Sequence, residues 1–382
     1  MINRERLTNT FMDLVKIDSV SKEEAQVSEM IEEILDTLGA DIVIDNAGEK
    51  TGGNAGNLIA RIKGNMDVAP LMLNAHMDTV EPGRGITPVL EEGVFMSQGD
   101  TILGADDKSA IAIILEALTI IKENKLPCGP LEVVFTVCEE IGLKGAKHLD
   151  FNLITADYGF ALDATDTRGV VTRAPSANRL EFLVHGKEAH AGAAPEKGIN
   201  AIQVASRAIA DLELGRIDEE TTCNIGVIQG GLATNIIPNL VKIKGEVRSH
   251  NTEQLEKVTQ NIVDAFERAA AEKGNKSGGS DLPSIDAHVE YDFTRTHIAE
   301  DHPVVALAAQ AARNLGREMT CKTTGGGADA NVFFQQGIVT GVLGTGMQNM
   351  HTINETVRLD DMVEAVELLL EILKLHAKGN RS

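Results

Sequence analysis

The chain has 382 residues, of which 57 are acidic and 35 are basic, and its formal net charge at pH 7 is −22. Such an acidic protein repels phosphate backbones and anionic lipid headgroups, so neither nucleic acid nor a membrane is expected as a partner. The length and a hydrophobic content of 43% fit two domains, each with its own core.

The first part of the chain alternates helix and strand patterns. Ser21-Lys22-Glu23-Glu24 forms a capping box, which predicts a helix that runs to about Leu38. Apolar runs and periodicity then predict strands at 41–45, 57–62 and 71–75, a helix at 108–122, and buried strands at 131–137 and 158–163. Continuous apolar strands that alternate with helices indicate an α/β fold, with an open, mostly parallel sheet and helices on both faces.

The middle of the chain follows a different order of elements. It is predicted to contain a strand at 179–184, a helix at 200–214, strands at 224–228 and 240–247, a helix at 252–271 and a strand at 288–293. The order is βαββαβ, which is the ferredoxin-like arrangement. A polar, glycine-rich stretch at 273–280 is predicted to be a solvated loop before the last strand.

After about residue 294 the first pattern returns. It predicts a helix at 302–315, a strand at 338–343 and a final helix at 360–375. A small domain is therefore inserted into a larger one. The larger, discontinuous domain is predicted to comprise residues 1–176 and 294–382, and the inserted domain residues 177–293.

The cysteines and the N-terminus favour a cytoplasmic protein. The four cysteines are scattered and form no C-x-x-C pair, so no disulfide framework is expected. The first six residues are polar and lack the apolar core of a signal peptide. The longest apolar stretch, 110–121, is interrupted by Glu116 and is too short to span a bilayer.

Possible metal ligands stand where the strand patterns end. His76 and Asp78 close one apolar run, Glu139 and Glu140 follow another, and Asp163 ends a third. In an open α/β sheet, ligands bind beyond the carboxyl ends of the strands. These side chains are therefore expected to meet at one edge of the sheet.

Two further candidates come from elsewhere in the chain. Asp106 lies in Gly104-Ala105-Asp106-Asp107-Lys108, before a helical pattern, and His351 follows the strand pattern at 338–343. Two histidines and several carboxylates at one sheet edge form a divalent-metal site, and two metals are indicated. Asp106 is our choice for a carboxylate that bridges both cations. Asp107 is interpreted as a helix cap or as the ion-pair partner of Lys108.

Each of these residues has a simpler interpretation when taken alone. His-x-Asp can be a polar strand end, a glutamate pair is usually surface charge, and His190 can be an ordinary loop histidine. Directly after a buried strand, however, Glu139 and Glu140 occupy a poor place for unpaired charges. They can divide the work, one binding metal and the other serving as general base. Asp78 can hydrogen-bond the second ring nitrogen of His76.

Taken together, these motifs resemble those of the co-catalytic zinc exopeptidases. This family includes peptidase T, the aminoacylases, the glutamate carboxypeptidases and succinyl-diaminopimelate desuccinylase, and the resemblance is strongest to the peptidase T-like proteins. It covers nearly the whole chain. The motifs that carry it are His76-Met77-Asp78-Thr79, Gly104-Ala105-Asp106-Asp107-Lys108, Glu139-Glu140-Ile141-Gly142, Asp163, His190-Ala191-Gly192, and His351 with Glu355.

The resemblance implies two zinc ions per chain, with manganese or cobalt as alternatives, in a catalytic, metal-binding larger domain. Asp106 would bridge the two ions. The full implied ligand set is His76, Asp106 and Asp163 for one ion and Asp106, Glu140 and His351 for the other. Glu139 would then be the general base, and Asp78 would orient His76.

For the inserted domain, the resemblance implies a lid that also forms a homodimer. His190 would reach the active site of the other subunit and stabilise an oxyanion there. Asn235 and Arg248 resemble the family's contacts to the substrate carboxylate, and Gly326 lies in its glycine-rich substrate loop.

The implied function is hydrolysis of peptide bonds in short peptides by a peptidase T-like aminopeptidase. An aspartate at position 163 resembles the aminopeptidases, since a glutamate is more usual there in the carboxypeptidases and deacylases. The alternative within the family is an amidohydrolase or carboxypeptidase that acts on N-acyl amino acids or dipeptides. A non-catalytic binding protein on the same fold is the alternative from a different class.

Overall fold

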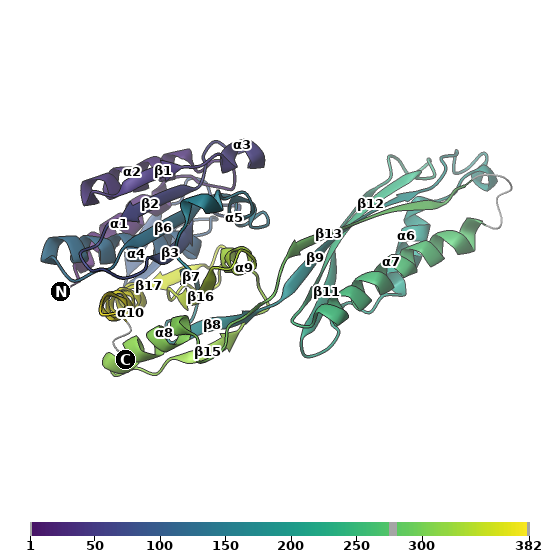
Figure 1. Cartoon of the computed structure of the whole chain (residues 1–382). Helices are drawn as coiled ribbons and strands as arrows, with labels where there is room; N and C mark the ends of the chain where they lie inside the picture. The colour runs from purple at the N-terminus through teal and green to yellow at the C-terminus, as the bar shows by residue number, and fades with distance from the viewer. Residues whose placement is uncertain (1, 275–280, 380–382) are drawn as a thin grey trace. The chain divides into compact units, whose positions relative to one another are not determined.

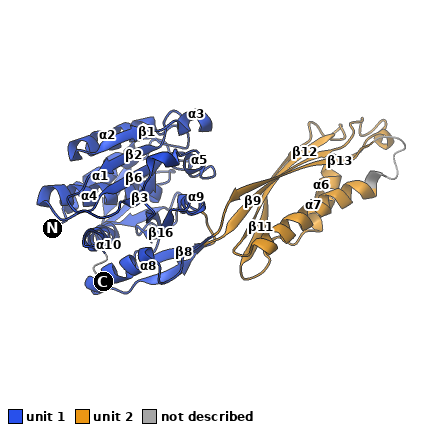
Figure 2. Ribbon diagram, viewed as in Figure 1, with its two compact units in different colours: residues 1–173, 296–324, 328–382 blue, residues 174–295, 325–327 orange. Residues whose placement is uncertain are grey.

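The structure is a computed structural model that describes residues 2–274 and 281–379. It contains two compact units (Figure 2). Unit 1 comprises Met1–Arg173, Thr296–Thr324 and Ala328–Ser382, and unit 2 comprises Ala174–Arg295 and Gly325–Gly327. The segment around Gly326, which was assigned to the larger domain, thus belongs to unit 2. Of the loop predicted at 273–280, residues 275–280 lie outside the described residues.

Unit 1 is an α/β unit built on one large mixed sheet (Figure 1). The sheet strands are β1 (Asp41–Ile44), β2 (Leu58–Ile62), β3 (Leu71–His76), β6 (Leu131–Thr136), β7 (Tyr158–Ala164), β8 (Gly169–Ala174), β14 (Thr296–His297), β15 (Thr320–Thr323) and β16 (Val339–Gly344). They lie in the order β1-β2-β6-β3-β7-β16-β8-β14, with β15 beside β8. The central strands β6, β3, β7 and β16 are parallel, whereas β1, β2 and β8 pair antiparallel to their neighbours toward the centre.

Helices pack on both faces of this sheet. The helices of unit 1 are α1 (Arg4–Lys16), α2 (Ala25–Leu38), α3 (Ala47–Thr51), α4 (Ala105–Asn124), α5 (Lys144–Lys147), α8 (Pro303–Asn314), α9 (Asp329–Gln335), α10 (Leu359–Ala377) and the 3-10 turn Phe151–Leu153. Gly341 of β16 approaches Val304 of α8, and the next residue, Val342, packs with Ala330 of α9. Because successive strand residues point to opposite faces, α8 and α9 cover opposite faces. The predicted α/β fold class is thereby confirmed.

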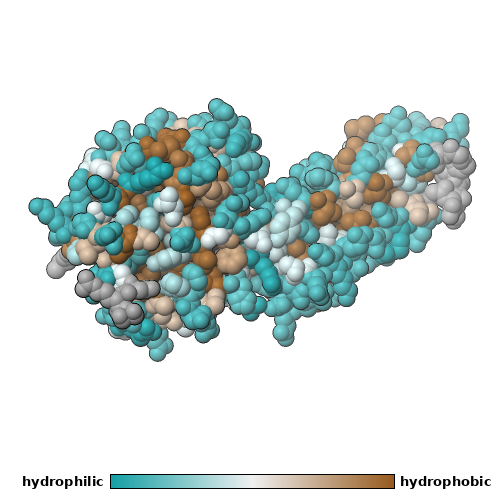
Figure 3. Space-filling view, in the orientation of Figure 1, coloured by the Kyte–Doolittle hydropathy of each residue, from teal (hydrophilic) through white to brown (hydrophobic). Residues whose placement is uncertain are grey.

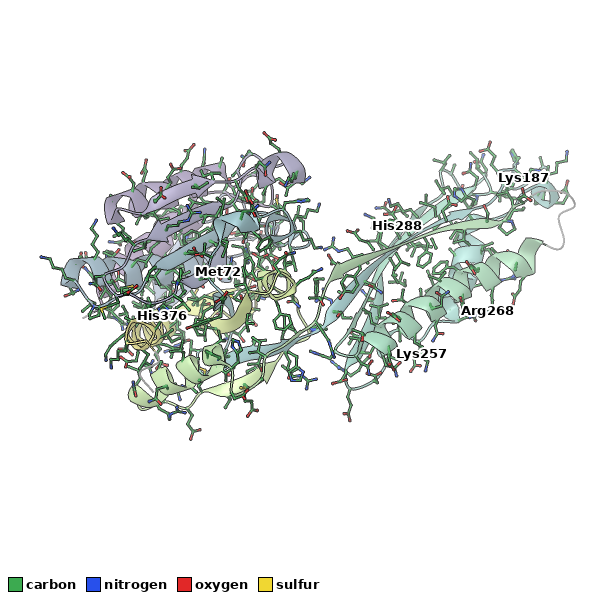
Figure 4. All side chains as sticks on the ribbon, in the orientation of Figure 1. Met72, Lys187, Lys257, Arg268, His288 and His376 are labelled. Atoms are coloured by element: carbon green, nitrogen blue, oxygen red, sulfur yellow. The ribbon has the colours of Figure 1, made fainter. Side chains whose placement is uncertain are left out.

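The core of unit 1 explains why its strands read as continuous apolar runs. Every residue of β3 and β6 is buried, because both strands are covered on both faces. Met72, in β3, is fully buried and lies well inside unit 1 (Figure 4). In the part of the chain that the structure describes, no helix is long and apolar enough to cross a membrane.

Two local features of unit 1 differ from the sequence prediction. α2 begins at Ala25, and its N-cap Glu24 makes no side-chain capping bond, so the predicted capping box is wrong. The Ser21 hydroxyl donates instead to Asp78, at 2.6 Å, and Glu24 accepts the backbone N–H groups of Lys22 and Cys138. The Ser21 hydroxyl and the Glu24 carboxylate thus bind residues far away in the chain, Asp78 and Cys138, and form no capping box.

Several elements of unit 1 were not predicted. α1 is one of them, and its buried residues Leu7, Phe11, Leu14 and Val15 form the inward stripe of an amphipathic helix. A small antiparallel sheet in the order β17-β5-β4 is another, made of β4 (Pro88–Glu91), β5 (Val94–Ser97) and β17 (Thr356–Arg358).

Unit 2 is an antiparallel sheet covered on one face by two helices. Its elements are β9 (Ser176–His185), the 3-10 turn Pro195–Lys197, α6 (Ala201–Ala210), β10 (Gly215–Arg216), β11 (Thr221–Gly230), β12 (Leu240–Ser249), α7 (Thr252–Gly274) and β13 (Ser284–Phe293). The strand order β11-β12-β9-β13 is that of the predicted βαββαβ arrangement. Phe182 of β9 stacks on Phe266 of α7 at 4.1 Å between ring centroids. Lys257 and Arg268 lie on the exposed side of α7 (Figure 4).

Candidate metal centre

Three parallel strands deliver the first candidate ligands to one edge of the sheet. β3 ends at His76, whose strand partner in β6 is Thr136, the last residue of that strand. Glu139 and Glu140 follow β6 directly, and Asp163 is the penultimate residue of β7. Since carboxyl ends of parallel strands meet at one edge, the side chains gather there as the sequence indicated.

Asp106 lies between the two histidines. Its Oδ1 is 3.0 Å from His76 Nε2, and its Oδ2 is 3.3 Å from His351 Nε2. His351 Nε2 is also 3.0 Å from Glu140 Oε1. Ligand atoms of His76, Asp106 and Glu140 all lie within 4.8 Å of one another. A carboxylate with one oxygen toward each imidazole has the geometry needed to bridge two cations.

The two flanks of this cluster differ in exposure. The side chain of His76 is 3% exposed, whereas that of His351 is 53% exposed. The His351 side of the cluster is therefore open to solvent, and small molecules can reach it from there. The His76 side lies deep at the sheet edge.

Asp107 also belongs to the cluster, which corrects its interpretation as a cap or partner of Lys108. Its Oδ2 accepts the backbone N–H of His76 at 3.2 Å, and the Lys108 ammonium donates to the Ile17 carbonyl at 2.7 Å. Ligand atoms of His76, Asp107 and Asp163 lie within 4.8 Å of one another. Asp106 and Asp107 have non-helical backbone angles, so both side chains turn toward the sheet edge rather than along the helix.

The pKa values of the cluster are shifted in the way expected for buried carboxylates that have too little positive charge beside them. Burial raises the pKa of Asp107, Glu139 and Asp163 well above their ordinary values, and neighbouring carboxylates add to the effect. Hydrogen bonds to Asp106 and Glu140 raise the pKa of His351 to about 10. A divalent cation would supply the missing charge in place of protons.

Asp106 behaves in the opposite way. Burial alone would raise its pKa, but the hydrogen bonds with His351 and His76 outweigh burial and hold the pKa of Asp106 below its ordinary value. It is the carboxylate of the cluster that stays ionised most readily. One buried oxygen of the neighbouring Asp107, Oδ1, has no hydrogen-bond partner among the described residues. Such an unpaired buried oxygen fits a site that takes a cation.

Asp78 orients both His76 and the glutamate pair. His76 Nδ1 is 2.9 Å from the backbone oxygen of Asp78 and 3.5 Å from its Oδ1. The Asp78 carboxylate accepts the backbone N–H of Glu139 at 2.8 Å and that of Glu140 at 3.2 Å. Its closest contact to the imidazole is thus made by the main chain, while its carboxylate holds the segment after β6.

Two buried carboxylates beside the site were missed in the sequence. Asp329, at the start of α9, accepts the Thr136 hydroxyl, and burial raises its pKa to about 6. Glu24 accepts the backbone N–H of Cys138 at 3.0 Å. The only local sign of Asp329 is its place two residues after the glycine run 325–327, and Glu24 was interpreted as part of a capping box.

The remaining candidates lie in unit 2. Backbone N–H groups of Gly192 and Ala193 both donate to His190 Nδ1 at 3.1 Å. Nδ1 is then an acceptor, so a neutral His190 carries its proton on Nε2 and can donate from there. Asn235 is its neighbour, because the Asn235 carbonyl accepts the N–H of Ala191 at 2.9 Å.

Arg248 and the glycine run form a second group in unit 2. Arg248 Nη1 donates to the Gly325 carbonyl at 3.3 Å, and its other nitrogens bind Glu246 at 3.0 Å. Gly327 packs so tightly on Phe293 that a Cβ there would lie 2.4 Å from the ring. This close packing explains why Gly326 and its neighbours group with unit 2.

Residues 72–375 match the family model described as "Peptidase family M20/M25/M40". The aminopeptidase PepT from Bacillus cereus is 41% identical, with a TM-score of 0.86 over 98% of this chain and 99% of that one. A tripeptidase from Staphylococcus aureus is 38% identical, with a TM-score of 0.91 over 99% and 100% of the two chains. Peptidase T of Fusobacterium nucleatum is 29% identical over 331 residues, which are 85% of this chain and 78% of its own length.

Proposed function

Because the chain belongs to peptidase family M20/M25/M40, we propose that it is a metal-dependent aminopeptidase that removes the N-terminal residue of short peptides. The observation that carries the proposal is the Asp106 carboxylate, with one oxygen toward His76 and the other toward His351. Similarity to PepT and to a tripeptidase, in each case over nearly the full length of both chains, supports the peptide substrate.

We propose that the centre holds two divalent cations. One would lie among His76, Asp106 and Asp163, and the other among Asp106, Glu140 and His351. The Asp107 carboxylate lies beside His76 and Asp163 and would add negative charge around the first cation. Imidazole and carboxylate ligands suit zinc, and also manganese or cobalt. Cations bound there would supply Lewis acidity, which lowers the pKa of water and polarises a carbonyl group.

Glu139 is proposed as the general base. Its own backbone N–H is held by the Asp78 carboxylate, the residue is buried, and its side chain is in neither of the ligand groups described above. Burial raises the pKa of Glu139 well above its ordinary value, which suits a carboxylate that first accepts and then returns a proton near neutral pH. Glu139 would take the proton of the attacking water and pass it to the leaving amine.

We propose that unit 2 is a lid that pairs two chains. β10 covers β11 only at Thr222 and Cys223, within the described residues. Beyond them β11 carries the exposed apolar residues Val227 and Ile228, and Leu232, two residues past the end of the strand, is 83% exposed. Apolar surface is visible on unit 2 in Figure 3. An open edge strand is a pairing liability that a two-fold dimer would cover.

In such a dimer, His190 would donate from Nε2 to the oxyanion in the partner's site, an effect worth about 3 to 4 kcal/mol for one well-placed donor. Asn235, Arg248 and Gly326 are proposed to contact the substrate carboxylate. The four cysteines are free, which supports a cytoplasmic location.

A substrate screen tests the proposed activity. The protein is stripped of metal, reloaded with zinc, manganese or cobalt, and offered free and N-acetylated di- and tripeptides. We expect release of the N-terminal residue from free peptides and none from blocked ones. Preferred hydrolysis of N-acetylated substrates would establish the amidohydrolase alternative. A protein that binds the metals and hydrolyses nothing would be the non-catalytic alternative.

A further inference from the structure

Glu355 joins two segments of the metal centre that are far apart in the chain. It lies four residues after His351, and its side chain is buried, with the whole residue 1% exposed. Its Oε2 accepts the backbone N–H groups of Leu103 and Gly104, at 2.8 and 2.7 Å. Its Oε1 accepts the N–H of Asp106 at 2.9 Å. One carboxylate from the His351 segment thus holds the backbone that carries Asp106.

The Asp106 segment needs such a partner. Gly104 has a left-handed φ of 73°, and Asp106 has a ψ of 101°, so this stretch precedes the regular part of α4. Its N–H groups have no preceding helical turn to bind to, and buried N–H groups must be satisfied. The three distances lie in the range of well-formed N–H···O hydrogen bonds, so one side chain satisfies all three N–H groups.

We propose that Glu355 is a positioning residue: it fixes the Asp106 backbone so that the Asp106 carboxylate stays between His76 and His351, and so sets the placement of both metal positions. The inference rests on the metal-dependent function proposed above. Groups of this kind, which orient ligands without binding metal, change metal affinity or activity by about 10 to 100-fold when they are removed.

The competing explanation is that Glu355 only stabilises the fold. Glu132 provides a matched control for it, because it is buried and accepts the N–H groups of Thr155 and Ala156 at 2.8 and 2.9 Å. It also accepts the Thr155 hydroxyl at 2.6 Å. Glu132 lies at the start of β6, and the metal centre lies beyond the end of that strand. Substitution of Glu132 therefore removes hydrogen bonds of the same kind, but none that involves a residue of the metal centre.

The experiment compares Glu355→Gln, Glu355→Asp and Glu132→Gln in the full chain. Cobalt affinity is measured by titration into stripped protein, the visible absorption spectrum is recorded at full cobalt occupancy, and kcat, KM and Tm are determined. We expect Glu355→Gln to bind cobalt about 10 to 100-fold more weakly, to alter the spectrum and to lower kcat more than it changes KM. We expect Glu132→Gln to lower Tm alone.

The choice of variants follows from the bonds. In Glu355 both carboxylate oxygens accept hydrogen bonds from backbone N–H groups. Glutamine has a single acceptor oxygen, so its NH₂ group would face an N–H donor and leave it without an acceptor. Aspartate keeps two acceptor oxygens on a shorter side chain, and should therefore restore part of the affinity and of the wild-type spectrum. Equal cobalt affinity, spectrum and kcat in Glu355→Gln and wild type would overturn the proposal. So would a Glu355→Asp protein that fails to fold while Glu132→Gln folds.

The outcome can be separated from that of the proposed function. Cobalt affinity and the cobalt spectrum are measured without substrate. A wild type that binds cobalt in a Glu355-dependent way and hydrolyses no peptide would refute the peptidase proposal and keep this one. A wild type that binds no cobalt would refute both.

Discussion

The Asp78 carboxylate accepts the backbone N–H of Glu139 through Oδ1 at 2.8 Å, so the residue two positions after His76 also fixes the proposed base. The same carboxylate binds the N–H of Glu140 and the Ser21 hydroxyl. Its bonds therefore link the β3 end, the β6 end and the segment before α2. A substitution at Asp78 should therefore impair the placement of Glu139 more than it lowers the stability of the fold.

Asp78→Asn should lower kcat by about 10 to 100-fold while both metals remain bound. Asparagine has one acceptor oxygen, so one of the two N–H groups after Cys138 loses its partner. Steady-state kinetics and metal analysis check this expectation. Ser21→Ala is the control, because it removes a bond to Asp78 without freeing either N–H group. An Asp78→Asn enzyme with wild-type kcat would show that this carboxylate does not position the base.

Glu139→Gln should lower kcat by about 10²- to 10⁴-fold, the range typical of general acid–base catalysis, and should keep both metals. The reason is that glutamine cannot accept the proton of the attacking water. Glu140→Gln, its neighbour and control, should lose metal instead. If metal analysis finds the reverse, Glu139 is the ligand and Glu140 the base.

Metal stoichiometry tests Asp106 as the bridge. Wild-type protein should bind two divalent ions per chain at saturation, and Asp106→Ala should bind one or none and lose activity. The physical reason is that no other described carboxylate has one oxygen at each histidine. Elemental analysis of stripped and reloaded protein gives the answer. One ion per chain at saturation in wild type, or full activity in Asp106→Ala, would contradict the bridging role.

Metal should stabilise the protein more at pH 8 than at pH 6. The pKa of His351 is raised from 6.5 to about 10 by hydrogen bonds to Asp106 and Glu140, and burial raises that of Glu139 well above its ordinary value. Groups whose pKa is raised by folding contribute stability that is complete below the unfolded pKa and is lost as pH rises toward the folded pKa. For His351 this loss begins near pH 6.5, so the metal-free protein weakens as pH rises across the test range.

Bound cations take the place of these protons, and their binding strengthens as the ligands deprotonate. Asp106 does not disturb the comparison, because its pKa is lowered and it is ionised throughout this range. The measurement is the Tm of metal-loaded minus metal-free protein at the two pH values. The large acidic surface is the same in both forms, so its effect largely cancels. If this difference in Tm is equal or smaller at pH 8, protons do not take the place of cations in the metal-free site.

The site residues that lie at strand ends could be predicted from the sequence. β3, β6 and β7 are covered on both faces and therefore read as continuous apolar runs, and His76, Glu139 and Asp163 follow from where those runs stop. The order βαββαβ in unit 2 followed from turn-separated periodic segments in the same way.

The features that could not be predicted from the sequence depend on long-range contacts or backbone angles, which leave no local sequence pattern. The direction of Asp107 is set by non-helical backbone angles just before a regular helix, which composition does not encode. Glu24 had a plausible local role as a capping residue, but its carboxylate accepts the backbone N–H of Cys138, which is 114 residues away, in addition to that of Lys22. α1 was missed for another reason: its inward stripe begins at Leu7 and is surrounded by polar residues.

Mixed subunits test whether His190 acts across a dimer. Glu139→Gln and His190→Ala should each be inactive alone, and a mixture should recover activity. In a heterodimer, the subunit with intact Glu139 receives an intact His190 from its partner, which completes one site of two. Random exchange makes half of the dimers mixed, so recovery should approach about a quarter of wild-type activity.

The matched control for this experiment is a mixture of Glu139→Gln with Asp106→Ala. Both residues belong to the same cluster in unit 1, so every site in the mixed dimer lacks one of them and no activity should return. Native mass spectrometry establishes that subunits have exchanged, and peptide hydrolysis is then measured on the same sample. If exchange is complete and the His190→Ala mixture stays as inactive as the control, His190 acts within its own chain or has no part in catalysis.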